Sequence, residues 1–572
     1  MLMILRCFKR DVKIGAMFIL LSLGCQPKHP LSPILLGVTA ENAMVVSARK
    51  EASAIGLSVM ARGGNAFDAM FATELALAVV YPYAGNLGGG GFMVYRLADG
   101  STGSLDYREM APSAAHRDMF LDRSGNHDTA KSTVGGLAIG VPGTIKGIFA
   151  AQKKFGLLSV EALMNPVIEL AEKGYVVTQK QCERLAQYRE IIRQTTGTQT
   201  LYTRDINPGD TIKNLALAQT LRRLRDQGQE AFYQGDMAEH MSTYIQAKGG
   251  VIQSEDFEHY KVHWRDPVSF QYEDLTITSM GPPSSGGICL GQIMGMLEPY
   301  DFDDLDHNNA LYIQLLTEAE RRAYADRSHY LGDPDFVSIP TEQLLSRAYL
   351  EQKMASFDPK RATASEHIAH GPLIGHESDE TTHYSIVDPF GNAISVTTTI
   401  NGAYGSKLFD PELGFFYNNE MDDFSAKPGT PNMFGLIGGT ANAIAPGKRM
   451  LSSMTPTIVT KQGELWQVLG SPGGSTIITT VLQIILNTHH FNMGMQQAVN
   501  QPRMHHQWLP DLIQFESEGF EQKLLDSLEQ KGYQTIQKEY QIIGKVDAIM
   551  RHSTGILEAG ADPRGDDTAL GF

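Results

Sequence analysis

The pattern of the chain changes at residue 381, and this change limits the folds that it can adopt. Residues 141–245 carry mostly helical periodicity, and residues 311–328 are typical of an amphipathic helix with a charged side. After residue 381 the pattern becomes that of strands. Residues 382–388 and 393–400 flank the turn signal PFGN, and residues 457–460 and 465–469 indicate a second pair. Residues 475–487 predict a buried helix, so we expect an α+β fold.

The segment before this change differs from the rest of the chain. Residues 360–380 hold few large apolar side chains, three histidines and four acids. We therefore expect an exposed, mobile segment. The histidines form no H-E-x-x-H motif, and we expect no metal site.

The composition limits the classes of protein that this chain can represent. Of its 572 residues, 42% are hydrophobic and 20% charged, which suits a large folded core and excludes a disordered or coiled-coil protein. The formal net charge of −16 argues against a nucleic-acid-binding protein, so we expect no nucleic-acid partner. Four cysteines in this length are too few for a disulfide scaffold and too widely spaced for a C-x-x-C metal site.

The first 30 residues resemble an export signal. Basic side chains precede the apolar run AMFILLSLG at residues 16–24, and Cys25 follows. This run is too short to cross a bilayer as a helix. LSLGC resembles a bacterial lipobox, whose cysteine is lipidated, although Ser22 stands where leucine is usual. We expect a periplasmic protein, either anchored through Cys25, soluble, or held by an uncleaved signal.

Thr381 lies at the junction between the acidic segment and the first predicted strand. A threonine hydroxyl is a weak nucleophile unless a base lies beside it. Cleavage between Glu380 and Thr381 would create a free α-amine with a pKa of about 7.7–8.0, which can accept the hydroxyl proton. The alternative is that Thr381 merely begins an edge strand.

Residues further along the chain add groups that such a nucleophile needs. Gly473 and Gly474 precede the buried helix, where their N–H groups can stabilise an oxyanion. Other side chains suit the two ends of an α-amino acid. The groups for a carboxylate are Arg108, Ser452 and Ser453, and those for an amine are Glu420 and Asp423.

Several long motifs in register make this chain resemble the γ-glutamyltranspeptidase family. After residue 380 they are TTHYSIVD from residue 381, TTTING from 397, NNEMDDF from 418, RMLSSM from 449, SPGGS from 471 and ADPRGDD from 561. Near the start they are NLGGGGFM from residue 86 and DYREMAP from 106. The resemblance runs from about residue 40 to residue 572.

The resemblance implies a fold and a maturation step. The fold is that of the N-terminal-nucleophile hydrolases, a four-layer αββα sandwich. The precursor cleaves itself between Glu380 and Thr381 into a large subunit, residues 31–380, and a small catalytic subunit, residues 381–572, which stay together as a heterodimer.

The resemblance also implies a role for each site residue. Thr381 is the nucleophile, its new amine is the base, and Thr399 positions it. Gly473 and Gly474 form the oxyanion hole. The residues that bind the substrate α-carboxylate are Arg108, Ser452 and Ser453, and those that bind its α-amine are Asn401, Glu420 and Asp423. Residues 431–447 match the lid loop, where Phe434 replaces the tyrosine of many bacterial members and cannot make the lid-closing hydrogen bond.

The activity implied by the resemblance is transfer of γ-glutamyl groups from glutathione and similar amides to water, amino acids or peptides, without metal or organic cofactor. One alternative is a related enzyme that cleaves β-lactam side chains or poly-γ-glutamate. Asp423 argues against the β-lactam acylase, because an acyl chain without an α-amine has no use for its charge. Another alternative is a non-catalytic, lipid-anchored protein that binds amino acids. Retention of Thr381, Thr399 and both glycines argues against it.

Overall fold

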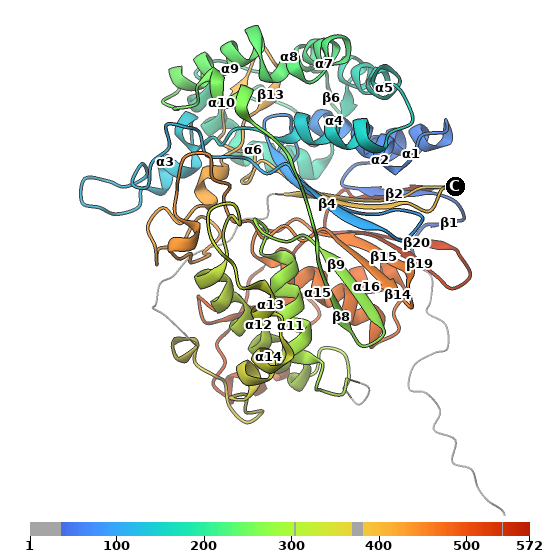
Figure 1. Ribbon diagram of the computed structural model, residues 1–572, viewed down its shortest axis with the longest axis vertical. Coiled ribbons are helices and arrows are strands. Elements are labelled where there is room, and N and C mark those ends of the chain that lie inside the picture. The colour runs from blue at the N-terminus through green and yellow to red at the C-terminus, as the bar shows by residue number, and fades with distance from the viewer. Residues whose placement is uncertain (1–35, 303–304, 369–380, 540) are drawn as a thin grey trace, which may run out of the picture.

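Two seven-stranded antiparallel sheets lie face to face at the centre of the molecule, between two groups of helices (Figure 1). The computed structural model describes residues 36–302, 305–368, 381–539 and 541–572. Its layers follow the order helices, sheet, sheet, helices, which confirms the expected αββα sandwich. The predicted export signal lies outside the described residues, as does Glu380.

The sheet nearer the N-terminal helices combines strands from both sides of residue 381. Its strands in spatial order are β21 (Thr568–Gly571), β2 (Met44–Ser47), β10 (Thr382–Val387), β11 (Ala393–Thr399), β3 (Gly90–Arg96), β4 (Thr102–Asp106) and β7 (His263–Arg265). The predicted hairpin of β10 and β11 is therefore confirmed, and it lies between β2 and β3. The parts of the chain before and after residue 381 thus share backbone hydrogen bonds in three strand pairings of this sheet: β21 with β2, β2 with β10, and β11 with β3.

The second sheet holds the other predicted strand pair. In spatial order it consists of β1 (Thr39–Ala40), β20 (Leu557–Ala561), β19 (Asp547–Arg551), β15 (Glu464–Gly470), β14 (Thr457–Lys461), β9 (Leu275–Ser279) and β8 (Val268–Tyr272). Apolar side chains such as Val46, Phe92 and Val468 fill the space between the sheets. Small hydroxyls also bond across it: Ser385 Oγ donates to the Asp547 carbonyl at 2.8 Å, and Ser395 Oγ to that of Leu469 at 2.9 Å.

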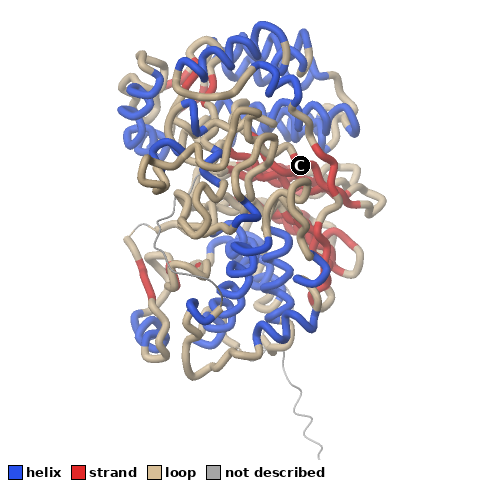
Figure 2. The backbone as a smooth tube through the Cα atoms, turned by 60° about the vertical axis from the view of Figure 1, so that its left-hand side comes forward, coloured by secondary structure: helices blue, strands red, loops and turns tan. Residues whose placement is uncertain are grey.

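Helices cover the outer faces of both sheets (Figure 2). The first group contains α1 (Lys50–Ala61), α2 (Ala66–Val80), α4 (Thr144–Phe155), α5 (Val160–Lys173), α6 (Gln179–Thr196), α7 (Leu215–Gln227), α8 (Glu230–Tyr233), α9 (Gly235–Ala247) and α10 (Ser254–His259). The second contains α11 (Gly286–Leu297), α12 (Ala310–Tyr330), α13 (Thr341–Leu344), α14 (Arg347–Met354), α15 (Thr476–His489) and α16 (Met495–Asn500). Helical residues between 141 and 245 and the buried helix α15 match the sequence predictions. None of the helices in the described ranges is long and apolar enough to cross a membrane.

Helix α12 forms where the sequence predicts an amphipathic helix with a charged side. The acidic and basic residues of that side, between Glu318 and Arg327, are buried. Glu318 pairs with Arg321 and Arg322 on the same helix, which offsets the cost of burying these charges. Helical periodicity alone does not reveal that a charged side faces another part of the fold.

The segment predicted to be exposed, residues 360–380, is described only as far as residue 368. Within that part, Ser365 is buried, and its Oγ accepts a hydrogen bond from Arg321 Nη1 at 2.8 Å. The Asp511 carboxylate accepts a hydrogen bond from the Ser365 N–H at 2.8 Å. Ser365 therefore packs against the fold, whereas Lys360, Arg361, Glu366 and His367 are exposed. The mobility of the segment stays a prediction.

Candidate active site

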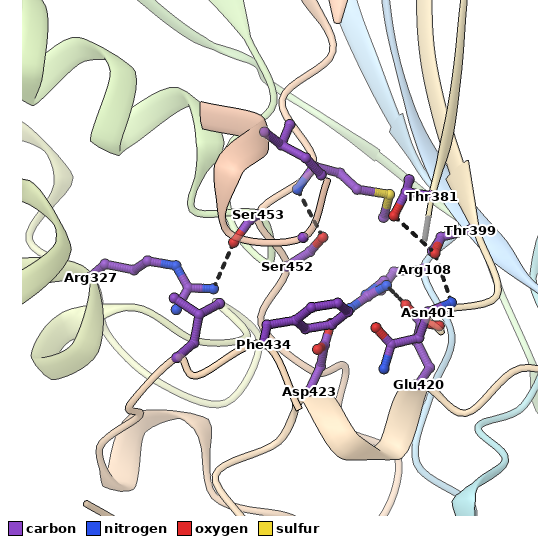
Figure 3. Close-up of a pocket in the computed structure, with 14 residues that line it drawn as sticks. Arg108, Arg327, Thr381, Thr399, Asn401, Glu420, Asp423, Phe434, Ser452 and Ser453 are labelled. Atoms are coloured by element: carbon purple, nitrogen blue, oxygen red, sulfur yellow. Dashed lines mark hydrogen bonds and ion pairs between the residues drawn. The ribbon is translucent and has the colours of Figure 1, made fainter. Parts of the chain in front are cut away.

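The register between β10 and β11 places Thr381 beside Thr399. Thr382 lies opposite Thr398 in this antiparallel pair, so the preceding residue meets the following one at the end of the hairpin. The two Oγ1 atoms are 3.4 Å apart (Figure 3). Thr399 Oγ1 also accepts a hydrogen bond from the Asn401 N–H at 2.7 Å. The pairing predicted between the two threonine hydroxyls is thus present in the fold.

One small pocket collects nearly all of the predicted site residues. It has an empty volume of about 300 Å³. Its predicted residues are Arg108, Thr381, Thr399, Asn401, Glu420, Asp423, Phe434, Ser452, Ser453 and Gly474. Gly473 is the residue before Gly474 in the sequence but is not among the lining residues. Glu380 lies outside the described residues. The pocket also contains four residues that the sequence did not single out: Arg327, Leu436, Met454 and Ile477.

Gly473 and Gly474 form a turn directly before α15. Their φ angles are +132° and +55°, a region that glycine occupies more readily than other residues. Within the described part of the chain, neither N–H donates a hydrogen bond to a protein acceptor. Two unsatisfied donors near a helix N-terminus suit a developing oxyanion.

A buried cluster of opposite charges forms another wall of the pocket. The Arg108 guanidinium contacts the carboxylates of Glu420 and Asp423, and that of Glu109 lies 3.6 Å away. Burial raises the pKa of Glu420 and of Asp423, while Arg108 opposes that increase. Burial also raises the pKa of Glu109 to about 8. The cluster offers both a cation and carboxylates, which together complement a zwitterionic α-amino acid.

The glycine-rich turn NLGGGGFM supports this cluster through close backbone packing. A Cβ at Gly88 would lie 2.3 Å from the carbonyl oxygen of Phe416. The Asn418 side chain fixes the same region, because its Nδ2 donates to the carbonyls of Gly88 and Gly140 at 2.8 Å each. Its Oδ1 accepts from the Glu420 N–H at 3.0 Å, so the turn helps to hold Glu420 at the pocket.

The loop that matches the family lid lies against the pocket. The Phe434 ring packs over Gly474, where an added Cβ would lie 2.6 Å from the ring. The contacts nearest Phe434 are three hydrogen bonds: Asn432 Nδ2 donates to Asp423 Oδ1 at 3.2 Å, the Met433 N–H donates to Asp422 Oδ2 at 2.9 Å, and Gln507 Nε2 donates to the Phe434 carbonyl at 3.3 Å. None of them requires a hydroxyl on residue 434.

Arg327 and Glu74 are the polar residues at or near this site that the motifs missed. Arg327 lies on α12, for which the sequence pattern predicted a charged side but assigned no role to any one residue. Glu74 lies in α2 and accepts hydrogen bonds from Tyr384 Oη at 2.7 Å and Thr398 Oγ1 at 2.6 Å. The sequence held one sign of a buried polar role for Glu74, because it is an acidic residue within the mostly apolar segment AFDAMFATELALAVV.

Comparisons with known proteins agree with this geometry. A model of the family "Gamma-glutamyltranspeptidase" matches residues 52–572. The chain is 42% identical to the glutathione hydrolase proenzyme of Escherichia coli strain K12 over 100% of both chains. It is 44% identical to the protein of the same name from Pseudomonas sp. strain A14, over 86% of this chain and 87% of that protein.

Solved structures give the same result. The γ-glutamyltranspeptidase of Helicobacter pylori has 42% identity and a TM-score of 0.55, covering 57% of this chain and 94% of that one. A cephalosporin acylase from Bacillus halodurans has a TM-score of 0.82 over 96% of this chain and 99% of that one. Its 24% identity establishes only a shared fold. Taken with the family match over residues 52–572 and the full-length identity of 42%, the shared fold places this chain in the γ-glutamyltranspeptidase family.

Proposed function

We propose that this protein transfers γ-glutamyl groups from glutathione and similar amides to water or to the amines of amino acids and peptides. The observation that carries the proposal is the shared pocket of the Thr381–Thr399 pair and the charged cluster around Arg108. A nucleophile thus lies beside groups that suit an amino-acid end. Full-length relatives named glutathione hydrolase proenzyme support the choice of substrate.

The proposed reaction begins after cleavage has freed the α-amine of Thr381. This amine takes the proton from Oγ1, which attacks the γ-carbonyl carbon of the donor. The carbonyl oxygen becomes an oxyanion, stabilised by the N–H groups of Gly473 and Gly474. The intermediate collapses, the C–N bond breaks, and the leaving amine takes the proton from the Thr381 ammonium. A γ-glutamyl ester on Thr381 remains. Water or an amine then attacks it and gives a proton to the Thr381 amine, which passes that proton to Oγ1 as the C–Oγ1 bond breaks and the product leaves.

The proposed recognition uses the opposite charges of the pocket. The donor α-carboxylate binds Arg108, Ser452 and Ser453. The donor α-ammonium binds Asn401, Glu420 and Asp423. A zwitterion can enter the ion pair between Arg108 and Asp423 without leaving either charge uncompensated, which offsets much of the desolvation cost of binding.

The proposed maturation is self-cleavage between Glu380 and Thr381, giving two chains that remain associated. The interleaved sheet supports this association, because β10 pairs with β2 and β11 pairs with β3. Separating the products would break these pairings, together with those of β21 with β2, β20 with β1 and β14 with β9, and expose buried apolar side chains. The proposed location is the periplasm, either with an anchor at lipidated Cys25 or without one; the export pattern of residues 1–30 supports it.

Turnover of a γ-glutamyl anilide, with and without a dipeptide acceptor, tests the proposed activity. Wild-type protein should release the aniline alone and form a γ-glutamyl dipeptide when the acceptor is present. An acyl anilide without an α-amine is the matched control, since it cannot use the carboxylates of Glu420 and Asp423. Faster release from that control would favour the acylase alternative. Binding of the donor without any release would favour the non-catalytic alternative.

A further inference from the structure

Arg327 is a second guanidinium in the pocket, and its pairing differs from that of Arg108. It is 4% exposed and extends from α12 toward Ser453 (Figure 3). Its Nε donates to Ser285 Oγ at 2.9 Å, and its Nη2 donates to Ser453 Oγ at 3.1 Å. Among the residues that the structure describes, no carboxylate forms an ion pair with Arg327, whereas Arg108 has three such partners. Asp423 attracts the Arg327 charge only from beyond ion-pair distance. A buried charge without a close counter-ion is costly, so the arrangement favours an anion supplied by a ligand.

The hydrogen bond from Arg327 leaves the Ser453 hydroxyl free to act as a donor toward the pocket. A serine hydroxyl donates one hydrogen bond and accepts others. Ser453 Oγ already accepts from Arg327, and over the described ranges its hydrogen has no acceptor. Ser452 is arranged in the same way, because its Oγ accepts from the Met454 N–H at 3.1 Å. Both hydroxyls line the pocket and are available as donors.

Arg327 also braces the backbone of the serine pair. Ser285 Oγ, which accepts from Arg327 Nε, donates to the Ser452 carbonyl at 2.7 Å. The Ser285 N–H donates to the same carbonyl at 2.8 Å. The guanidinium therefore contacts Ser453 directly and Ser452 through Ser285. Because its fork is planar and rigid, the two bonds fix the direction of both contacts.

We propose that Arg327 is a positioning residue for recognition of the donor α-carboxylate. It holds the Ser453 hydroxyl as a hydrogen-bond donor toward the pocket and polarises it with a positive charge that forms no ion pair with a described carboxylate and that Asp423 attracts only from a longer distance. Arg108 then binds the donor α-carboxylate directly while it stays paired with Glu420 and Asp423. Arg327 acts on the same carboxylate only through Ser453. This inference rests on the proposed function, since it assumes that the ligand is a γ-glutamyl donor.

Steady-state kinetics with a γ-glutamyl anilide and saturating dipeptide test the proposal. Arg327→Met should lower kcat/KM by about 10- to 100-fold, the usual effect of losing a charge-assisted hydrogen bond. The loss should come from a higher donor KM, with kcat changed less than about threefold. Because Arg327 acts through Ser453, the double variant with Ser453→Ala should be about as slow as Ser453→Ala alone.

Two lysine variants serve as a matched pair and keep the test valid if Arg327→Met fails to fold. Arg327→Lys keeps the charge but cannot make both bonds of the fork, so its donor KM should rise. Arg322→Lys changes another buried arginine of α12. Its guanidinium donates to the Glu318 carboxylate and to the Lys353 backbone carbonyl rather than to pocket residues. Its donor KM should stay at the wild-type value.

The outcomes separate this inference from the proposed function. If the effects of the Arg327 and Ser453 variants multiply, or if kcat falls while the donor KM stays constant, the positioning role is wrong although the enzyme assignment stands. The same holds if both lysine variants raise the donor KM equally. If the cleaved wild-type protein releases no aniline, the proposed function fails, and the inference fails with it.

Discussion

Asp423 shows how several contacts combine on one side chain. One carboxylate oxygen contacts Arg108, and the other accepts from Asn432 of the lid loop at 3.2 Å. A substrate ammonium at this position would add a third interaction. The residue therefore links substrate charge, the Arg108 cluster and the loop that covers the pocket.

Asp423→Asn should weaken donor binding strongly while leaving self-cleavage intact. The variant removes a buried charge that the proposed substrate ammonium requires, and such a loss typically costs about 2–5 kcal/mol. The donor KM should rise accordingly, and a denaturing gel should still show two chains. Kinetics equal to those of the wild type would exclude Asp423 from the amine site.

Single residues also show what the sequence could and could not predict. The motifs identified the residues that line the pocket because they lie in short, distinctive segments. Arg327 escaped notice, since periodicity gives the faces of α12 but not which other part of the fold covers each face. Likewise, the sequence predicted the hairpin but not its position between β2 and β3, which depends on pairing between distant parts of the chain.

At the scale of elements, Glu74 connects α2 to both strands of the hairpin whose ends carry Thr381 and Thr399. It accepts hydrogen bonds from Tyr384 of β10 and Thr398 of β11. Burial raises its pKa to about 7, although both hydrogen bonds oppose the increase. Thr398 is adjacent to Thr399, so Glu74 supports the strand that carries the predicted partner of the nucleophile.

Glu74→Gln should change how stability depends on pH. Between pH 4.5 and about 7 the folded protein keeps the Glu74 proton that the unfolded chain has released. The wild type therefore loses stability through this window, by about 3 kcal/mol from this group. Glutamine resembles the protonated acid and does not titrate. Melting temperatures measured from pH 4.5 to 8 should thus fall more for the wild type, and parallel curves would contradict the prediction.

The lid loop is the second element whose role can be tested. Phe434 is 4% exposed and covers Gly474 at the predicted oxyanion hole. Phe434→Ala should open the pocket to water and raise the donor KM about tenfold, through loss of a packed aromatic ring. Phe434→Leu, which retains most of the apolar contact, should stay closer to the wild type. Equal kinetics in all three proteins would show that the ring does not close the pocket.

At the scale of the whole molecule, the sequence separates export from catalysis. The export pattern ends before the first described residue, whereas every residue that lines the pocket lies after residue 100. We therefore expect changes in the export signal to alter the location of the protein without altering its chemistry.

Cys25→Ser should move the enzyme from the membrane fraction to the soluble fraction if Cys25 is lipidated. Acyl burial stabilises an anchor by about 0.8 kcal/mol per buried CH₂, and stable anchoring needs more than one chain. Mass spectrometry of the mature large subunit provides the direct measurement. An unmodified N-terminus at or after residue 25 would contradict lipidation, and an intact Met1 would support the uncleaved signal. The specific activity should be the same in all cases.

The central claim is that Thr381 cleaves the chain and then carries the γ-glutamyl group. Intact-mass spectrometry of the wild type and Thr381→Ala, before and after brief exposure to a γ-glutamyl donor, tests both parts. The wild type should give a fragment that begins at Thr381 and gains the mass of one γ-glutamyl group on that residue. Thr381→Ala should give one uncut chain without the adduct. Cleavage of Thr381→Ala at the same bond, or an adduct on another residue, would contradict the account.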